Sequence, residues 1–523
     1  MKKKDKCTVE INELVAKLQR IVGQDWVRRD DLTRYYYGSD VATYFSQGEI
    51  YPEHHPLLVV YPASPEDVQG VVRLAQKYDI PLYAIGGGTV LLIGSMPAVP
   101  DVSITLDFHR MQKVEVDQDR MVIRVQPGVT GLQVCQLIRY MDFGYRPYFG
   151  GSPGTSHFVP YQIFVGQNKL AGHQDGMGIH CATGMEMVLP SGEIMRTGSM
   201  AQPGAPAWPH GPGPALTYLP FIANAGYGVV TAMEFRFFST PLETASLWVM
   251  FDTVGAAVKG IYEVVKQEYG CGICLMGHGC YVHCLYSSRH WQEGVHFIKA
   301  TRTDSNLVGM AFRGSKGKVN YERNACIKIL KRHGGVPLPP WMVSILDGHE
   351  TNASGWQQNN NMRSLGTFNG KHDTGGLFIT SGVFDTLETL EEHMEQGLKD
   401  YQEVCAGYPE YLNTPSSPSF RLYVNCVQAY LTMGGHSNAA GEFIFMVDYA
   451  NRKQLPLVRE LSERFAAAMQ KYGSAPLSLG RDRRTWTECT AHFEMAKLIK
   501  NTIDPKGLMA PGVAFPITIP TEE

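Results

Sequence analysis

The sequence lacks the features that mark several large classes of protein. It contains no run of about 18 apolar residues, the length that a membrane-spanning helix requires, so we expect no membrane span. Its 47 lysines and arginines nearly balance 50 acidic residues, and no long block of like charge occurs, so we expect no nucleic-acid partner. Its 11 cysteines are an odd number in a chain of 523 residues, which favours a reducing cytoplasm over a disulfide framework.

The N-terminus also lacks the apolar core of a signal peptide. Four lysines stand among the first six residues, but polar residues interrupt the later stretch ELVAKLQRIV at helical spacing. This pattern predicts an amphipathic helix and no cleaved leader, which agrees with a cytoplasmic location.

Three consecutive glycines, Gly86–Gly88, follow the short apolar run PLYAI. Before that run, Ser64–Asp67 has the signature of a helix start, with serine at the N-cap and proline at the first helical position. Glycine allows positive φ and leaves its amide open to close approach, so such a turn can bind a phosphate. The turn has neither G-x-G-x-x-G spacing nor a following Lys-Ser/Thr, so it is neither a Rossmann fingerprint nor a P-loop.

Further motifs follow the glycine turn in a definite order. They are a strand TLDF, a hairpin around residues 117–120, a second glycine loop at 150–154, a strand-turn-strand GMEMVLPSGEIMRTG and the segment GYGVVT at 226–231. This order resembles the FAD-binding domain of the vanillyl-alcohol oxidase / p-cresol methylhydroxylase superfamily. The segment His180-Cys181, followed by GMEMVL, and the tail TIDPKGLMAPG at 502–512 are similar to its branch that oxidises 4-substituted phenols.

The resemblance implies an α+β fold, with a two-subdomain FAD-binding domain of the p-cresol methylhydroxylase type and an α+β cap that binds substrate. We expect an N-terminal helical segment at 1–55, the FAD-binding domain at 56–241, the cap at 242–480 and a C-terminal segment at 481–523 that returns to the FAD-binding domain. The residues that the resemblance places against FAD are Ile85, Gly86, Gly87, Gly88, Thr89, Gly150, Gly151, Ser152, Gly228, Val230 and Thr231. The first glycine turn has no histidine that could carry a covalent flavin, so we expect non-covalent FAD.

Flavin-dependent oxidation usually needs a base for the proton that leaves with the hydride. Four residues are candidates for catalysis: Glu488, His436, Tyr148 and His180. Each also has an ordinary structural explanation, as a helix-capping acid, a loop histidine, a packed tyrosine and a histidine beneath the cofactor. The sequence alone leaves both explanations open.

One departure from the family pattern concerns substrate binding. The phenol-oxidising branch holds its substrate phenolate with a Tyr-Arg pair, and Cys489 and Thr490 stand at those positions here. Our leading hypothesis is an FAD-dependent oxidoreductase that dehydrogenates a small organic substrate, and the resemblance implies a phenolic one. One alternative is a D-2-hydroxyacid dehydrogenase with Arg363 or Arg421 as the carboxylate clamp, and another is a catalytically degenerate, flavin-binding partner subunit. The electron acceptor is expected to be oxygen or a redox protein, and the chain a homo-oligomer.

A cluster of thiols and imidazoles between residues 271 and 284 resembles a metal site in composition. It comprises Cys271, Cys274, His278, Cys280, His283 and Cys284. Their spacing matches no familiar zinc or iron–sulfur pattern, and YVHCLYS alternates like a strand, which would turn its side chains to opposite faces. We therefore predict no metal.

Overall fold

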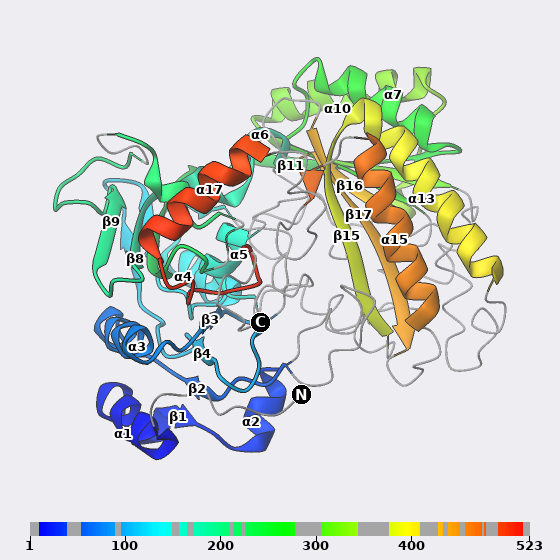
Figure 1. Cartoon of the computed structure of the whole chain (residues 1–523). Helices are drawn as coiled ribbons and strands as arrows, with labels where there is room; N and C mark the ends of the chain where they lie inside the picture. The colour runs from blue at the N-terminus through cyan, green and yellow to red at the C-terminus, as the bar shows by residue number, and fades with distance from the viewer. Residues whose placement is uncertain are drawn as a thin grey trace.

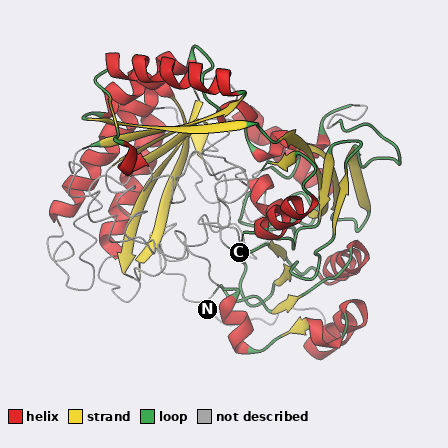
Figure 2. Cartoon of the chain, turned by 180° about the vertical axis from the view of Figure 1, so that it is seen from behind, coloured by secondary structure: helices red, strands yellow, loops and turns green. Residues whose placement is uncertain are grey.

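The computed structural model of the chain describes fifteen stretches (Figure 1). These are residues 10–38, 54–88, 96–148, 156–164, 172–208, 213–221, 223, 225–277, 305–343, 376–407, 427–431, 438–448, 455–472, 475–476 and 490–515. The helices and strands form a mixed architecture built on three sheets (Figure 2), which confirms the predicted α+β class. Within these stretches, no helix has the length and apolarity needed to cross a bilayer.

The first sheet is small and mostly parallel. Its order is β1 (Val27–Arg28), β2 (Leu58–Val60), β4 (Ile104–Asp107) and β3 (Leu82–Ile85), with β2, β4 and β3 parallel and β1 antiparallel to β2. The helices α1 (Ile11–Val22) and α3 (Pro65–Tyr78) share a core with these strands, and α2 (Asp31–Tyr36) contacts β2. The predicted helix start is confirmed, because the Ser64 hydroxyl caps α3 by accepting the Asp67 N–H.

The second sheet is antiparallel. Its order is β5 (Val114–Asp117), β6 (Val122–Val125), β10 (Val229–Ser239), β8 (Ala182–Val188) and β9 (Ile194–Gly198), and β7 (Tyr145–Pro147) also pairs with β10. The predicted hairpin and strand-turn-strand are both present. The helices α4 (Gly131–Met141), α5 (Phe158–Phe164) and α6 (Gly172–Asp175), with the 3-10 helix η2 (Gly178–Cys181), lie in the connections.

The third sheet is antiparallel throughout and has eight strands. Its order is β14 (Val336–Pro337), β11 (Glu243–Phe251), β13 (Asn306–Gly314), β12 (Gly272–Gly277), β16 (Val427–Leu431), β17 (Asn438–Asp448), β15 (Gly376–Thr386) and β18 (Ala475–Pro476). One hydrophobic core joins β11, β12 and β13 to α7 (Val254–Val265), α10 (Lys316–Arg332), α13 (Leu387–Gly407) and α15 (Leu455–Tyr472). We call this part of the chain, residues 243–476, the cap, and the first two sheets with their helices the flavin part.

The last helix, α17 (Thr490–Ile503), lies against the flavin part, although it follows the cap in sequence (Figure 1). The tail beyond it extends the first sheet, because the Leu82 N–H donates to the Leu508 carbonyl and the Ala510 N–H donates to the Leu82 carbonyl, each at 2.8 Å. The tail therefore lies beside β3, the strand that leads into the glycine turn.

Candidate flavin and substrate site

The glycine turn lies at the carboxyl end of β3, where the parallel strands of the first sheet also end. Ligands of open parallel sheets bind at this edge. Gly88 has φ +61°, a conformation that suits glycine, and Gly87 is exposed. At Gly86 a Cβ atom would lie only 2.7 Å from the Pro160 side chain, so this position must stay bare for α5 to pack. The turn thus leaves its backbone open to the close approach that a phosphate cradle requires.

A buried nitrogen lies near the turn. His157 Nδ1 has no hydrogen-bond partner among the described residues, and its Cβ is 3.4 Å from the position that a Gly86 Cβ would take. Burial lowers the pKa of His157. Because the other ring nitrogen donates to the Pro127 carbonyl, Nδ1 of the neutral ring is an acceptor, so the bare glycine turn alone fits the pyrophosphate of a dinucleotide. Thr89 and the second glycine loop, with Gly150, Gly151 and Ser152, lie outside the described residues.

The third predicted contact segment starts β10. Gly228 has φ +154°, and a Cβ there would lie 2.7 Å from the Val188 carbonyl oxygen. The Val230 side chain belongs to the core, and the Thr231 hydroxyl donates to Glu186 Oε1 at 2.9 Å. Packing within the sheet is enough to explain why glycine, valine and threonine stand at positions 228, 230 and 231. The contact of these residues with FAD therefore stays a prediction.

Two of the four predicted catalytic residues lie together around Gly176. The Tyr148 side chain is 1% exposed and its hydroxyl donates to the Gly176 carbonyl at 2.7 Å, while burial raises its pKa well above the usual value. His180 Nδ1 accepts a hydrogen bond from the N–H of Met177, the residue after Gly176, at 3.2 Å. Glu488 and His436 lie outside the described residues, as do the proposed carboxylate clamps Arg363 and Arg421.

Beside Gly176 lies a buried ionic cluster that the sequence analysis did not predict. Asp175 Oδ2 accepts hydrogen bonds from Arg146 Nη2 at 2.9 Å and from Arg313 Nη1 at 2.8 Å, and Arg313 Nη2 donates to Oδ1. The Asp175 side chain is only 3% exposed. Burial opposes its ionisation, but the hydrogen bonds and charges of the two arginines prevail and hold the pKa of Asp175 below its usual range. In the sequence, the sign that could have pointed to this cluster is one acidic residue, Asp175, inside the irregular stretch GHQDGMG.

His173, two residues before Asp175, gives a pH-dependent prediction. Its side chain is 1% exposed and burial lowers its pKa to about 4, against 6.5 for the free side chain. Between these values the unfolded chain binds more protons, so folding stability must fall as the pH drops. At pH 5 we expect His173 to cost about 2 kcal/mol of unfolding free energy relative to pH 8.

The measurement is urea unfolding at pH 8 and pH 5, followed by far-UV circular dichroism. His173→Gln should lose about that much of the pH dependence, whereas His109→Gln, at an exposed histidine, should retain it. Equal pH dependence in wild type and His173→Gln would contradict the prediction.

Of the six cysteines and histidines between residues 271 and 284, the structure describes two, Cys271 and Cys274. Cys271 Sγ donates to the Ala311 carbonyl at 3.3 Å, and Cys274 lies in β12, where its sulfur is 2.9 Å from the position of a Gly309 Cβ. Within the described stretches, no three His, Cys, Asp or Glu side chains converge as a metal site would require. The other four members of the cluster lie outside those stretches, so the absence of metal stays a prediction.

Comparisons with known proteins add an independent observation. Residues 56–198 match a family described as FAD binding domain. The chain is 28% identical over 238 residues to the 4-cresol dehydrogenase [hydroxylating] flavoprotein subunit of Pseudomonas putida, covering 44% of this chain and 43% of that protein. It is 23% identical over 216 residues to a glycolate oxidase subunit of Bacillus subtilis, an alignment that covers 41% of this chain and 43% of that protein. These alignments thus span less than half of either relative.

The fold has a counterpart among solved structures. The crystal structure of p-cresol methylhydroxylase with substrate bound superimposes with a TM-score of 0.73 at 18% identity, covering 97% of each chain. At this identity the likeness shows the fold, and it extends over both the flavin part and the cap.

Proposed function

Residues 56–198 form the FAD-binding domain of a family of FAD-dependent oxidoreductases, as the resemblance predicted, and on this premise we propose that the chain dehydrogenates a small organic substrate. The observation that carries the proposal is the glycine turn Gly86–Gly88, which lies within the matched residues at the carboxyl end of a parallel sheet. FAD, when bound, supplies the acceptor for a hydride.

In this proposal the chain's own residues have separate tasks. The amides of Gly86–Gly88 hold the pyrophosphate. Tyr148 keeps its proton, because its pKa is raised and its hydroxyl donates to Gly176, so it orients that segment. His180 in its neutral form carries its proton on Nε2, because Nδ1 accepts the Met177 N–H. We assign removal of the substrate proton to Glu488 or His436.

Two substrate classes are supported by different relatives. Similarity to the 4-cresol dehydrogenase subunit favours a 4-substituted phenol, whereas Cys489 and Thr490 remove the usual phenolate-binding pair. Similarity to the glycolate oxidase subunit favours a 2-hydroxy acid. We propose a phenolic substrate first, a D-2-hydroxy acid as the second candidate, and oxygen or a redox protein as the electron acceptor. We also propose a cytoplasmic homo-oligomer.

The test starts with the absorbance spectrum of the purified protein. We expect a flavin spectrum, with the flavin passing into the supernatant on acid precipitation because it is held non-covalently. Anaerobic titration with 4-alkylphenols, and separately with D-lactate, should bleach the flavin in one series, and L-lactate serves as the matched control for the second.

Each outcome of this test is informative. A protein that stays colourless after incubation with FAD would contradict the proposal. Bound flavin that neither series bleaches, although dithionite does, would instead support the degenerate partner subunit.

A further inference from the structure

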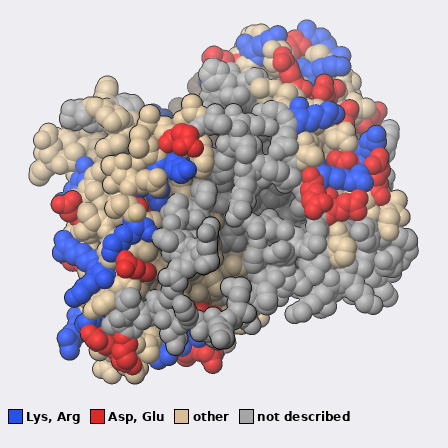
Figure 3. Space-filling model, in the orientation of Figure 1, with Lys and Arg blue, Asp and Glu red and all other residues tan. Residues whose placement is uncertain are grey.

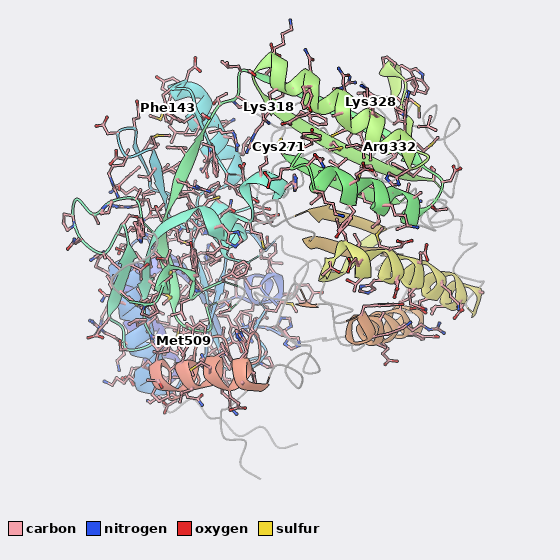
Figure 4. The ribbon with its side chains drawn as sticks, turned by 90° about the horizontal axis from the view of Figure 1, so that it is seen from above. Phe143, Cys271, Lys318, Lys328, Arg332 and Met509 are labelled. Carbon is pink, nitrogen blue, oxygen red and sulfur yellow. The ribbon has the colours of Figure 1, made fainter. Side chains whose placement is uncertain are left out.

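The flavin part and the cap meet at α6. This short helix contacts β12 and β16 of the cap, and the Gln174 N–H donates to the Cys271 carbonyl at 3.2 Å. Figure 4 shows Cys271 at the border between the two parts, and Figure 1 shows α6 on the side of the flavin part that faces the cap. We call this contact of α6 with β12 and β16 the seam between the two parts. It includes Asp175, the last residue of α6.

Asp175 connects the two parts by charge as well as by packing. Arg146 belongs to β7 of the flavin part, and Arg313 lies near the end of β13 in the cap. Arg313 reaches the carboxylate with both terminal nitrogens, a two-point contact that fixes direction as well as distance. Among the described residues, Asp175–Arg313 is the one ion pair that joins the flavin part to the cap.

The same segment leads back to the predicted flavin site. Asp175 is followed by Gly176, whose carbonyl accepts the Tyr148 hydroxyl. Gly176 has φ +78°, and a Cβ there would lie 2.8 Å from His180 Nδ1, so the His180 ring packs directly against this glycine. A shift of Asp175 would therefore be felt by Tyr148 and His180, two of the predicted site residues.

We propose that Asp175 is a positioning residue that holds the cap in register with the flavin part through Arg313, while Arg146 holds Asp175 in place. Loss of the carboxylate leaves two guanidinium groups of like charge facing one another across the seam. The seam then opens more often, without loss of the fold on either side. The proposal depends on the proposed function only where it concerns turnover.

The burial of Cys271 provides a probe that needs no substrate. Its thiol is 0% exposed and close enough to Arg313, Asp175 and Arg146 for their charges to act on it, while burial raises its pKa to about 12. Opening of the seam should expose this thiol to alkylation. Cys326 is equally buried, but it lies within the cap core on α10, where Glu322 rather than Asp175 or its arginines acts on it, and it serves as the internal reference.

The experiment measures N-ethylmaleimide labelling of Cys271 and Cys326 by peptide mass spectrometry on the FAD-loaded protein at constant pH. Asp175→Asn and Arg313→Gln should each speed labelling of Cys271 at least tenfold, the double variant should add little, and Arg313→Lys should fall between. Cys326 should be unaffected. Arg464→Gln is the matched control, because its partners Asp400, Glu403 and Glu460 all lie in the cap.

Two results would overturn the proposal. One is unchanged Cys271 labelling in Asp175→Asn, and the other is a parallel rise at Cys326, which would show general loosening of the cap. If a substrate bleaches the wild-type flavin, both seam variants should also reduce flavin at least tenfold more slowly, with FAD affinity changed less than twofold. If no substrate does, the proposed function fails while the labelling result still decides this inference.

Discussion

Replacing Gly88 with valine is expected to weaken FAD binding by about 100-fold or more. The residue has φ +61°, and a left-handed conformation costs a residue with a side chain roughly 1–2 kcal/mol, with β-branched residues the least tolerant. The new side chain would also stand in a turn whose amides are proposed to receive a pyrophosphate, so lost contacts add to the backbone strain. The measurement is the Kd of FAD for deflavinated protein, followed by quenching of flavin fluorescence.

Gly204 provides a matched control for this substitution. It has φ +76° and no atom within 4 Å of an added Cβ, so Gly204→Val carries similar backbone strain at a site outside the first sheet. Its FAD affinity should equal that of wild type. If Gly88→Val also binds FAD like wild type, or if both variants lose FAD equally, the turn does not cradle the cofactor.

The parts of this molecule that the sequence predicted are those with local signals. The Ser64 cap, the amphipathic α1, the hairpin after Asp117 and the paired strands β8 and β9 each depend on residues within about 15 positions of one another. Turn residues and hydrophobic periodicity act over this range, so these elements could be predicted from the sequence. The glycine turn could be predicted for the same reason, because its three glycines directly follow the strand in the sequence.

The seam between the two parts could not be predicted in this way. Asp175 is held by Arg146, 29 residues before it, and by Arg313, 138 residues after it. No local pattern distinguishes these arginines from others in the chain, because the tertiary fold alone selects which charge meets which. The motifs that carry the resemblance also lie outside the cap, which contributes Arg313. At Gly228 the sequence pattern was interpreted as a contact with a ligand. The structure gives a second reason for glycine there, because a Cβ atom would clash with the Val188 carbonyl oxygen.

The charge pattern visible on one face of the molecule does not reveal such pairs either. In Figure 3, lysines and arginines are interspersed with acidic residues over the described surface of the cap and of the flavin part. Exposed pairs of this kind contribute about 0–1 kcal/mol each. Among the described residues, the ion pairs with both side chains less than 10% exposed lie at Asp175 and at Lys500.

Replacing Lys500 with methionine is expected to destabilise the flavin part by about 3–5 kcal/mol, the usual result of removing one partner of a buried ion pair. Lys500 Nζ donates to Asp504 Oδ2 at 2.6 Å, to the Gly226 carbonyl at 2.5 Å and to the Met509 carbonyl at 2.8 Å. Both charged side chains are buried. Methionine has a similar length, so the variant removes the charge and three hydrogen bonds while it keeps most of the volume.

The consequence should reach FAD, because these bonds tie α17 and the tail to the flavin part, where the tail pairs with β3 beside the glycine turn. We expect the midpoint of thermal FAD release to fall by on the order of 10 °C. Lys506→Met is the matched control. Lys506 pairs with the exposed Asp79 and with the Gln76 carbonyl, so its loss should cost no more than about 1 kcal/mol. Equal shifts in the two variants would mean that the buried pair contributes no more to holding the tail than the exposed one does.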